Sequence, residues 1–216
     1  MAANRRPTAR SAKRTAQPRP AGYVRAPEYQ RGAKEALERL YPGVEVKTEW
    51  YPFLGESRDM YWPVVDVAVG PFATHQKFGS RYTELMKETR PFIQSLIEIH
   101  NTNVKALGRD EFANFRVLSE FNENARCLFC IEIEESGSRK HCLGNLVNAS
   151  ALGRIGILLA RNEKVLRIFV RQRAYFKFLA EVQKNTFRTV NALILTTGQF
   201  DECLREHVAA LSMDGE

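Results

Sequence analysis

The second half of the chain constrains the fold most, because its hydrophobic pattern switches repeatedly between the strand period and the helix period. Short apolar runs typical of buried strands occupy residues 126–134, 154–160 and 191–197. Helical spacing occupies residues 136–153, 163–184 and 201–211, and serine cap candidates and a glycine bound the first of these helices. Strands that alternate with helices in this order predict an α/β fold in which at least part of the sheet is parallel.

The first half is less regular but supplies further elements of the same kinds. We expect a short helix, an extended segment, a strand, a mainly helical stretch broken near Pro91, and a last short helix, at residues 31–43, 44–53, 62–72, 74–107 and 110–121. No internal repeat and no second domain boundary interrupts this order. The chain therefore predicts one α/β domain, which we place at residues 28–216.

The size and composition of the chain limit the class of protein. With 216 residues, of which 44% are hydrophobic, the chain can bury one sizeable core. It contains no apolar run near the roughly 18 residues that cross a bilayer, and its first twenty residues contain no secretory hydrophobic block. Four cysteines are too few for a disulfide scaffold. We expect a soluble, cytoplasmic protein.

The net charge of +7 is concentrated at the amino-terminal end. Residues 1–27 hold seven of the 32 basic residues, Arg5, Arg6 and Arg10 among them, and no acid, whereas the rest of the chain is formally neutral. This segment is rich in proline, alanine and arginine, and we expect a disordered basic tail. Three interpretations stay open: an arm that follows nucleic-acid phosphates, a solvated leader without a specific partner, and an organelle transit peptide.

Three carboxylates on two predicted strands form the main candidate site. Alternation places Asp66 mid-strand among apolar residues, and it places Glu132 and Glu134 on one face of another strand. A buried carboxylate is costly unless a partner or a metal compensates its charge, and converging carboxylates suit Mg²⁺. In the alternative interpretation the glutamates form a solvated face, and Asp66 pairs with a structural arginine, Arg126 or Arg154.

A basic turn follows the second of these strands. Residues 136–141 are polar or basic and lead into a predicted helix, whose first amides and dipole favour anions. Ser138, Arg139 and Lys140 are therefore candidate contacts to nucleic-acid phosphate. Acids that bind a metal beside cations that hold phosphate are what phosphodiester cleavage needs.

Together these residues resemble the PD-(D/E)XK nuclease superfamily, which includes many type II restriction endonucleases. In that family an acidic helix precedes a strand with a metal-binding aspartate, a strand with (D/E)-X-K, a helix and a further strand. By this resemblance, Pro63 and Asp66 stand near the first motif and Glu132-Ile133-Glu134 occupies the second. Glu35 or Glu38 would be the acid of the first helix.

The resemblance implies a restriction-endonuclease-like mixed sheet flanked by helices, with a helical insertion between the two motifs. Asp66, Glu132 and Glu134 would bind Mg²⁺ or Mn²⁺. Glu134 stands where the family usually has a lysine, so Lys140 would supply the cation. The implied activity is metal-dependent DNA endonuclease, with restriction as one form of it, DNA as the partner and a homodimer as a compatible state. The alternative is a catalytically inactive nuclease fold that binds nucleic acid or has a structural role.

Other residues have simpler explanations. Cys127, Cys130, His141 and Cys142 suggest zinc, but alternation predicts opposite faces for two cysteines three positions apart. His75 and His100 are interpreted as ordinary core or surface histidines. On the helix predicted at 163–184, the apolar side chains, Tyr175 included, are interpreted as core. The basic side chains of the same helix form either a solvated face or a ridge that contacts phosphate; these are Arg167, Arg171, Arg173 and Lys177.

Overall fold

A computed structural model describes residues 25–53, 63–73 and 77–213 of the protein. The first part of the chain forms α1 (Ala26–Leu40), β1 (Val46–Trp50), β2 (Val65–Val69), α2 (Gly79–Glu88), α3 (Arg90–Ala106) and α4 (Phe115–Glu120). The second part forms β3 (Cys127–Glu134), α5 (Arg139–Leu152), β4 (Gly153–Ala160), α6 (Glu163–Glu181), β5 (Ala192–Thr196) and α7 (Thr197–Met213).

The strands form one five-stranded mixed sheet in the order β1-β2-β3-β4-β5. The pairs β1–β2 and β2–β3 are antiparallel, whereas β3–β4 and β4–β5 are parallel. The α/β class and the partly parallel sheet are therefore confirmed. The two parallel connections run through α5 and α6, as the alternation of strand and helix patterns predicted.

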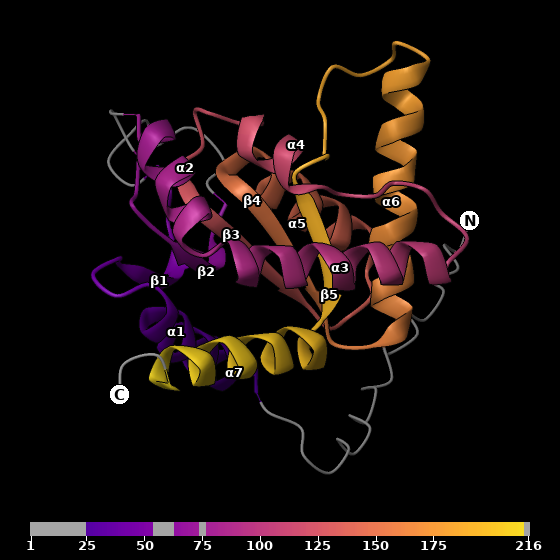
Figure 1. Ribbon diagram of the computed structural model, residues 1–216. Helices are drawn as coiled ribbons and strands as arrows, with labels where there is room; N and C mark the ends of the chain where they lie inside the picture. Colours follow the sequence, from indigo (N-terminus) through magenta and orange to yellow (C-terminus); the bar gives the residue numbers. More distant parts are fainter. Residues whose placement is uncertain (1–24, 54–62, 74–76, 214–216) are drawn as a thin grey trace, which may run out of the picture.

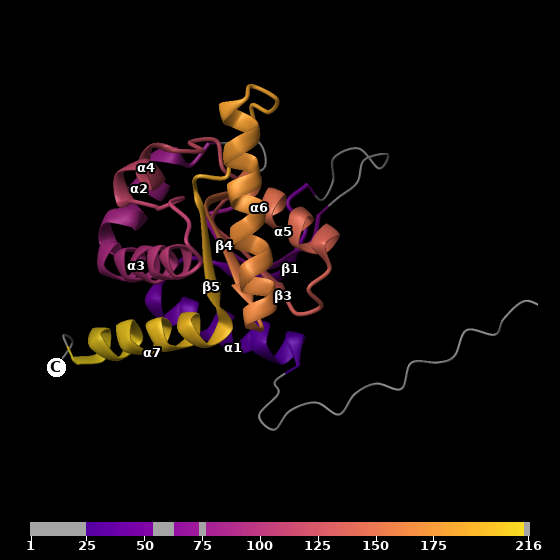
Figure 2. The same cartoon turned by 90° about the vertical axis from the view of Figure 1, so that its right-hand side faces the viewer.

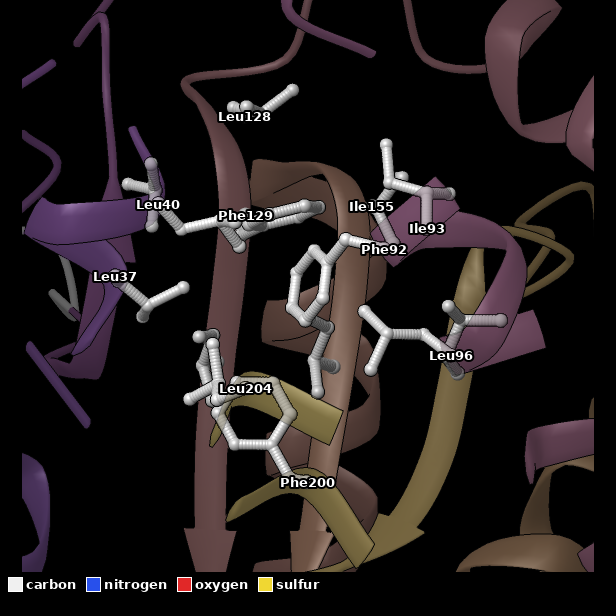
Figure 3. Close-up of a cluster of buried hydrophobic side chains, with 14 of the residues drawn as sticks. Leu37, Leu40, Phe92, Ile93, Leu96, Leu128, Phe129, Ile155, Phe200 and Leu204 are labelled. Carbon is white, nitrogen blue, oxygen red and sulfur yellow. The ribbon is translucent and has the colours of Figure 1, made fainter. Parts of the chain in front are cut away.

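Helices cover both faces of the sheet (Figures 1 and 2). Figure 2 shows α2, α3, α4 and α7 on one side of the sheet and α5 and α6 on the other. The larger apolar cluster lies between the sheet and α1, α2, α3 and α7; Leu37, Phe92, Phe129 and Phe200 are among its members (Figure 3). The second cluster lies between the sheet and the pair α5 and α6. Because both faces of β3 and β4 are buried, their sequences are nearly continuous apolar runs.

Close packing of α5 on β4 depends on a glycine. A Cβ atom on Gly156 would lie 2.7 Å from the carbonyl carbon of Ala149, which is shorter than real contacts allow. Ser138 and Asn162 cap the helices that flank this strand, each accepting a backbone N–H three residues further on. Local signals and packing thus agree in this half of the molecule.

Several predicted boundaries were wrong. Helix α1 begins at Ala26, inside the segment expected to be tail, because Pro27 in its first turn has the φ angle that a helix start requires. The stretch predicted at 74–107 forms two helices, α2 and α3, with the break at Thr89–Arg90 just before Pro91. Of residues 110–121, only Phe115–Glu120 are helical. Arg5, Arg6, Arg10 and His75 lie outside the described residues.

The basic residues of α6 divide between two environments. Arg167, Arg171 and Lys177 are exposed, but Arg173 is 4% exposed, so the prediction of a solvated face was wrong for that residue. Its guanidinium donates to the carbonyl oxygens of Glu111, Thr189 and Val190. Tyr175, predicted to be core, is 54% exposed. No helix among the described residues has the length and apolar character of a membrane span.

Candidate functional site

Three strands bring three acidic residues to neighbouring positions of the sheet. In β1 and β2, Thr48 pairs with Val67 and Trp50 with Val65, so Glu49 stands opposite Asp66. In β2 and β3, Val67 pairs with Ile131, so the next position places Asp66 opposite Glu132. The row Glu49–Asp66–Glu132, which we call the acidic row, therefore crosses from the edge of the sheet to its centre.

The backbone of the acidic row is unusual at its edge. Glu49 has a φ angle of 48°, in the left-handed region that residues other than glycine seldom adopt. Such a conformation costs about 1 kcal/mol or more, and it is concentrated at functional sites in folded proteins. It is held here inside a paired strand, one position from Trp50, which is buried.

Asp66 is held by two hydrogen bonds from different elements. Its Oδ1 accepts from Gln30 Nε2 at 2.9 Å, and its Oδ2 accepts from the backbone N–H of Ile133 at 2.7 Å. Gln30 Nε2 also donates to Glu49 Oε1 at 2.7 Å. One amide of α1, itself 5% exposed, thus connects two carboxylates of the acidic row. An arginine partner for Asp66 was a wrong alternative: Arg126 donates to the carbonyl of Ala73 and Arg154 to that of Ser119.

Burial and like charges raise the pKa values of the two inner carboxyls. Desolvation is the main cause for Asp66, whose pKa rises to about 6; the bond from Ile133 opposes the rise, while Glu49 and Glu134 add to it. Desolvation and then the charge of Asp66 raise the pKa of Glu132 well above its ordinary value. Hydrogen bonds from Asn148 and from the backbone of Asp66 offset this rise only in part.

Glu132 has an unfilled hydrogen-bonding position. Its side chain is 3% exposed, and its Oε1 is buried without a hydrogen-bond partner. An ionised carboxylate oxygen in that state is costly, and a bound cation or a proton would relieve the cost. Since Glu132 lies next to another carboxylate, the site has the electrostatic character of a cation-binding position.

Glu134 lies on the same strand but has different partners. Its Oε1 accepts from both the backbone N–H and the hydroxyl of Ser136, at 2.6 and 2.5 Å, and its Oε2 lies 3.5 Å from Asn145 Nδ2. One of its oxygens therefore already closes the turn between β3 and α5. The described ranges contain no group of three or more acidic, histidine or cysteine side chains placed to hold one metal ion. Asp66 and Glu132 are the inner pair of the candidate site.

The basic turn lies at the start of α5. Ser138 is the N-cap of α5, and its hydroxyl accepts from the N–H of His141 at 3.5 Å. Arg139 and Lys140 are exposed in the first turn of this helix. No described acid forms an ion pair with Lys140, and no hydrogen bond within the described ranges joins it to the acidic row. Asn145 and Asn148 are the α5 side chains that meet Glu134 and Glu132.

Sequence reasoning missed three residues of the site and placed others wrongly. Glu35 and Glu38, the candidate acids of the first helix, are exposed, and Glu38 pairs with Lys34. The α1 side chain that reaches the acids is Gln30. The missed residues are Gln30, Glu49 and Asn148. Of these, Asn148 carried a signal, because it is a polar residue between the buried positions Leu146 and Ala149.

Alternation was also wrong for the cysteine pair. Cys127 and Cys130 both belong to the cluster beneath α5 and α6, and the thiol of Cys127 contacts that of Cys130. Two successive residues between them, Leu128 and Phe129, both belong to the opposite cluster, so alternation breaks there. Burial is the main cause that raises the pKa of the Cys130 thiol. All four cysteines are free thiols in buried positions.

Comparisons with known proteins give no relative: no family model matches the chain, and neither a curated protein nor a solved structure is found to be similar to it.

Proposed function

We propose that the protein is a metal-dependent DNA endonuclease that hydrolyses phosphodiester bonds with Mg²⁺ or Mn²⁺. The observation that carries the proposal is the pair Asp66 and Glu132 on facing positions of β2 and β3, with the buried Glu132 Oε1 unpartnered. Two adjacent buried carboxylates destabilise each other, and a divalent cation reverses the sign of that interaction.

The order of elements supports the same proposal. Helix α1, strand β2 with Asp66, strand β3 with Glu132-x-Glu134, helix α5 and strand β4 follow one another as the resemblance to PD-(D/E)XK nucleases requires. The segment between the two motifs contains α2, α3 and α4, which form the expected helical insertion. This agreement concerns topology, and the chemistry rests on the carboxylate pair.

The donor set fits a hard cation, which prefers carboxylate and carbonyl oxygens. Asp66 and Glu132 would hold the ion, aided by the carbonyl of Ile133. When bound, it would neutralise charge on the scissile phosphate and lower the pKa of an attacking water. Gln30 and Asn148 orient the two carboxylates through their amide groups. The Oε1 of Glu134 is held by Ser136, so its Oε2, which lies 3.5 Å from Asn145 Nδ2, would be the oxygen that orients that water.

The first turn of α5 would hold the DNA backbone. It begins five residues after Glu134, carries Arg139 and Lys140 on its exposed surface, and directs its amino-terminal dipole to the same end of the sheet. Its contacts would be to phosphate and would not depend on base sequence. The basic residues that precede Ala26 would add to this electrostatic binding.

A second function is favoured by one specific observation. Where the nucleases that this chain resembles have a lysine, this chain has Glu134, and Lys140 does not contact the acidic row. Without a cation beside the reacting phosphate, a nuclease fold would bind nucleic acid without cutting it. This alternative keeps the phosphate-binding role of α5 and gives the carboxylates no role in turnover.

Cleavage of supercoiled plasmid in Mg²⁺ or Mn²⁺, with calorimetric titration of each metal, separates the two functions. We expect cleavage and metal binding in the native protein, and a loss of at least 10³-fold in cleavage rate for Asp66→Asn and for Glu132→Gln, since metal chemistry depends on both. Glu35→Gln, on the exposed side of α1, is the matched control and should cleave normally.

Metal binding without cleavage would favour the non-cutting alternative. Unchanged cleavage by both carboxylate variants would remove the acidic row from the mechanism.

A further inference from the structure

A polar cavity lies on the face of the sheet opposite the acidic row. It measures about 890 Å³ and is lined by the start of α2, by residues 123–124 and by Arg154 at the beginning of β4. Leu158, the register partner of Glu132, is four residues further along β4 than Arg154. Arg154 contacts α2 and α4, whereas Glu132 contacts α5, so the cavity and the acidic row lie on opposite faces of the sheet.

Arg154 lines this cavity and has unsatisfied hydrogen-bond donors. The side chain is 1% exposed and is among the largest that are fully buried. Its Nη2 donates to the carbonyl of Ser119 and lies 3.4 Å from the hydroxyl of Thr83, but its Nε and Nη1 have no partner. A buried guanidinium with two unused donors is costly, and the donor arrangement matches two oxygens of a phosphate or carboxylate.

Helix α2 directs its amino terminus at the same cavity. It spans ten residues, and its N-cap residue, Phe78, provides no side-chain hydrogen bond to the first turn. Gly79, Ser80 and Arg81, which carry the first amides of this helix, all line the cavity. Uncapped amides at a helix amino terminus, together with the helix dipole, favour a bound anion.

The charges around the cavity select an anion over a cation. Lys77, Arg81, Lys87 and Arg154 line it, against the two acids Glu84 and Glu123. Arg81 is paired with Glu84 and Glu88, which leaves Glu123 as the acid whose charge acts on Arg154. No ion pair joins Glu123 to Arg154 within the described ranges. Positive charge thus dominates beside the buried guanidinium.

We propose that this cavity is a binding site for a phosphate group, held by Arg154, by the first amides of α2 and by Lys77. A tetrahedral oxyanion would accept hydrogen bonds from Nε and Nη1 of Arg154 and from the amides of Gly79 and Ser80. The group could belong to a free phosphate compound or to a nucleic-acid backbone, because both present the same oxygens. The site does not depend on the metal-dependent activity of the acidic row.

Titration of the full chain with inorganic phosphate, followed by ¹H–¹⁵N NMR, tests the proposal. We expect saturable shifts of the Gly79 and Ser80 amides. Reversal of the rim charge in Lys77→Glu should weaken phosphate binding about tenfold, and Glu123→Gln should tighten it about threefold. Lys184→Glu, a similar exposed charge reversal beyond α6, is the control and should leave the affinity unchanged.

Arg154→Met should abolish the shifts of the Gly79 and Ser80 amides if the variant folds. If it does not fold, the phosphate affinities of Lys77→Glu and Glu123→Gln test the proposal. A duplex titration distinguishes the sources: a backbone phosphate predicts that Lys77→Glu also weakens DNA binding, whereas a free phosphate compound predicts no change there. Absence of saturable shifts at Gly79 and Ser80, or equal affinities for Lys77→Glu, Glu123→Gln and the native chain, would overturn the proposal.

Discussion

Two buried polar clusters of this protein differ in how completely their hydrogen bonds are satisfied. Arg173 donates to three backbone carbonyls, and His100 lies beside it with both ring nitrogens engaged. In the acidic row, by contrast, carboxylates face carboxylates, and Glu132 Oε1 has no partner. Since buried polar groups are normally paired, the first cluster is explained by structure alone, whereas in the second a bound cation or a proton would relieve the cost of the unpartnered oxygen.

The largest effect on stability should come from replacing Arg173, which belongs to the cluster whose hydrogen bonds are satisfied. Arg173→Met leaves the carbonyls of Glu111, Thr189 and Val190 without their donor, so we expect a loss of about 3 kcal/mol in the free energy of unfolding. Denaturant unfolding measures this loss. Arg171→Met, two residues away on the exposed face of α6, should change stability by less than about 0.5 kcal/mol. Equal stabilities would contradict the structural role of Arg173.

The stability of the protein should depend on pH through His100, which belongs to the same cluster. Burial and then the charge of Arg173 lower the pKa of His100 to about 3, so the folded state favours its neutral form. The contribution of His100 to the free energy of unfolding is fully present above its unfolded pKa of 6.5. It is lost as pH falls from there towards 3, by up to about 1.4 kcal/mol per pH unit.

Urea unfolding between pH 7 and pH 4 measures this contribution. His100→Gln cannot gain that proton, so its stability should fall less steeply over the same range. Parallel curves for the two proteins would show that His100 is not held neutral.

The acidic row should respond in the opposite direction to substitution. In metal-free buffer, Glu132→Gln removes a carboxyl group whose ionised form is destabilised by burial and by Asp66, so we expect the unfolding free energy to rise by about 1 kcal/mol. Thermal unfolding with and without Mg²⁺ measures the effect, and the metal should stabilise only the native protein. A variant that is less stable than the native protein without metal would mean that Glu132 is structural.

The smallest effect concerns the basic turn. Lys140 is exposed and does not contact the acidic row, so Lys140→Ala should leave the single-turnover cleavage rate within about threefold of native. Its DNA affinity should fall about threefold, and the slope of log affinity against log salt should decrease by about one, as for one lost phosphate contact. A rate loss of several orders of magnitude would instead make Lys140 the cation of the active site.

The accuracy of the sequence predictions differed between the sheet and its surroundings. Asp66 and Glu132 were correctly assigned to strands because alternation depends only on local backbone geometry. The other residues of this site were harder to predict, because Gln30 and Glu49 come from elements more than fifteen residues away from Asp66 in the sequence. Arg173 looked like its exposed neighbours Arg171 and Lys177, because helical spacing does not show which carbonyls a guanidinium can reach.

The sequence by itself determined the order of strands and helices, the α/β class and the strand positions of the carboxylates, since periodicity and caps act over a few residues. Only the tertiary structure decided that Asp66 faces Glu132, that Gln30 joins Asp66 to Glu49, and that Arg154 lines a cavity at the start of α2. The physical reason is that hydrogen bonding and desolvation depend on distances across the sheet, and strand register and helix packing set those distances.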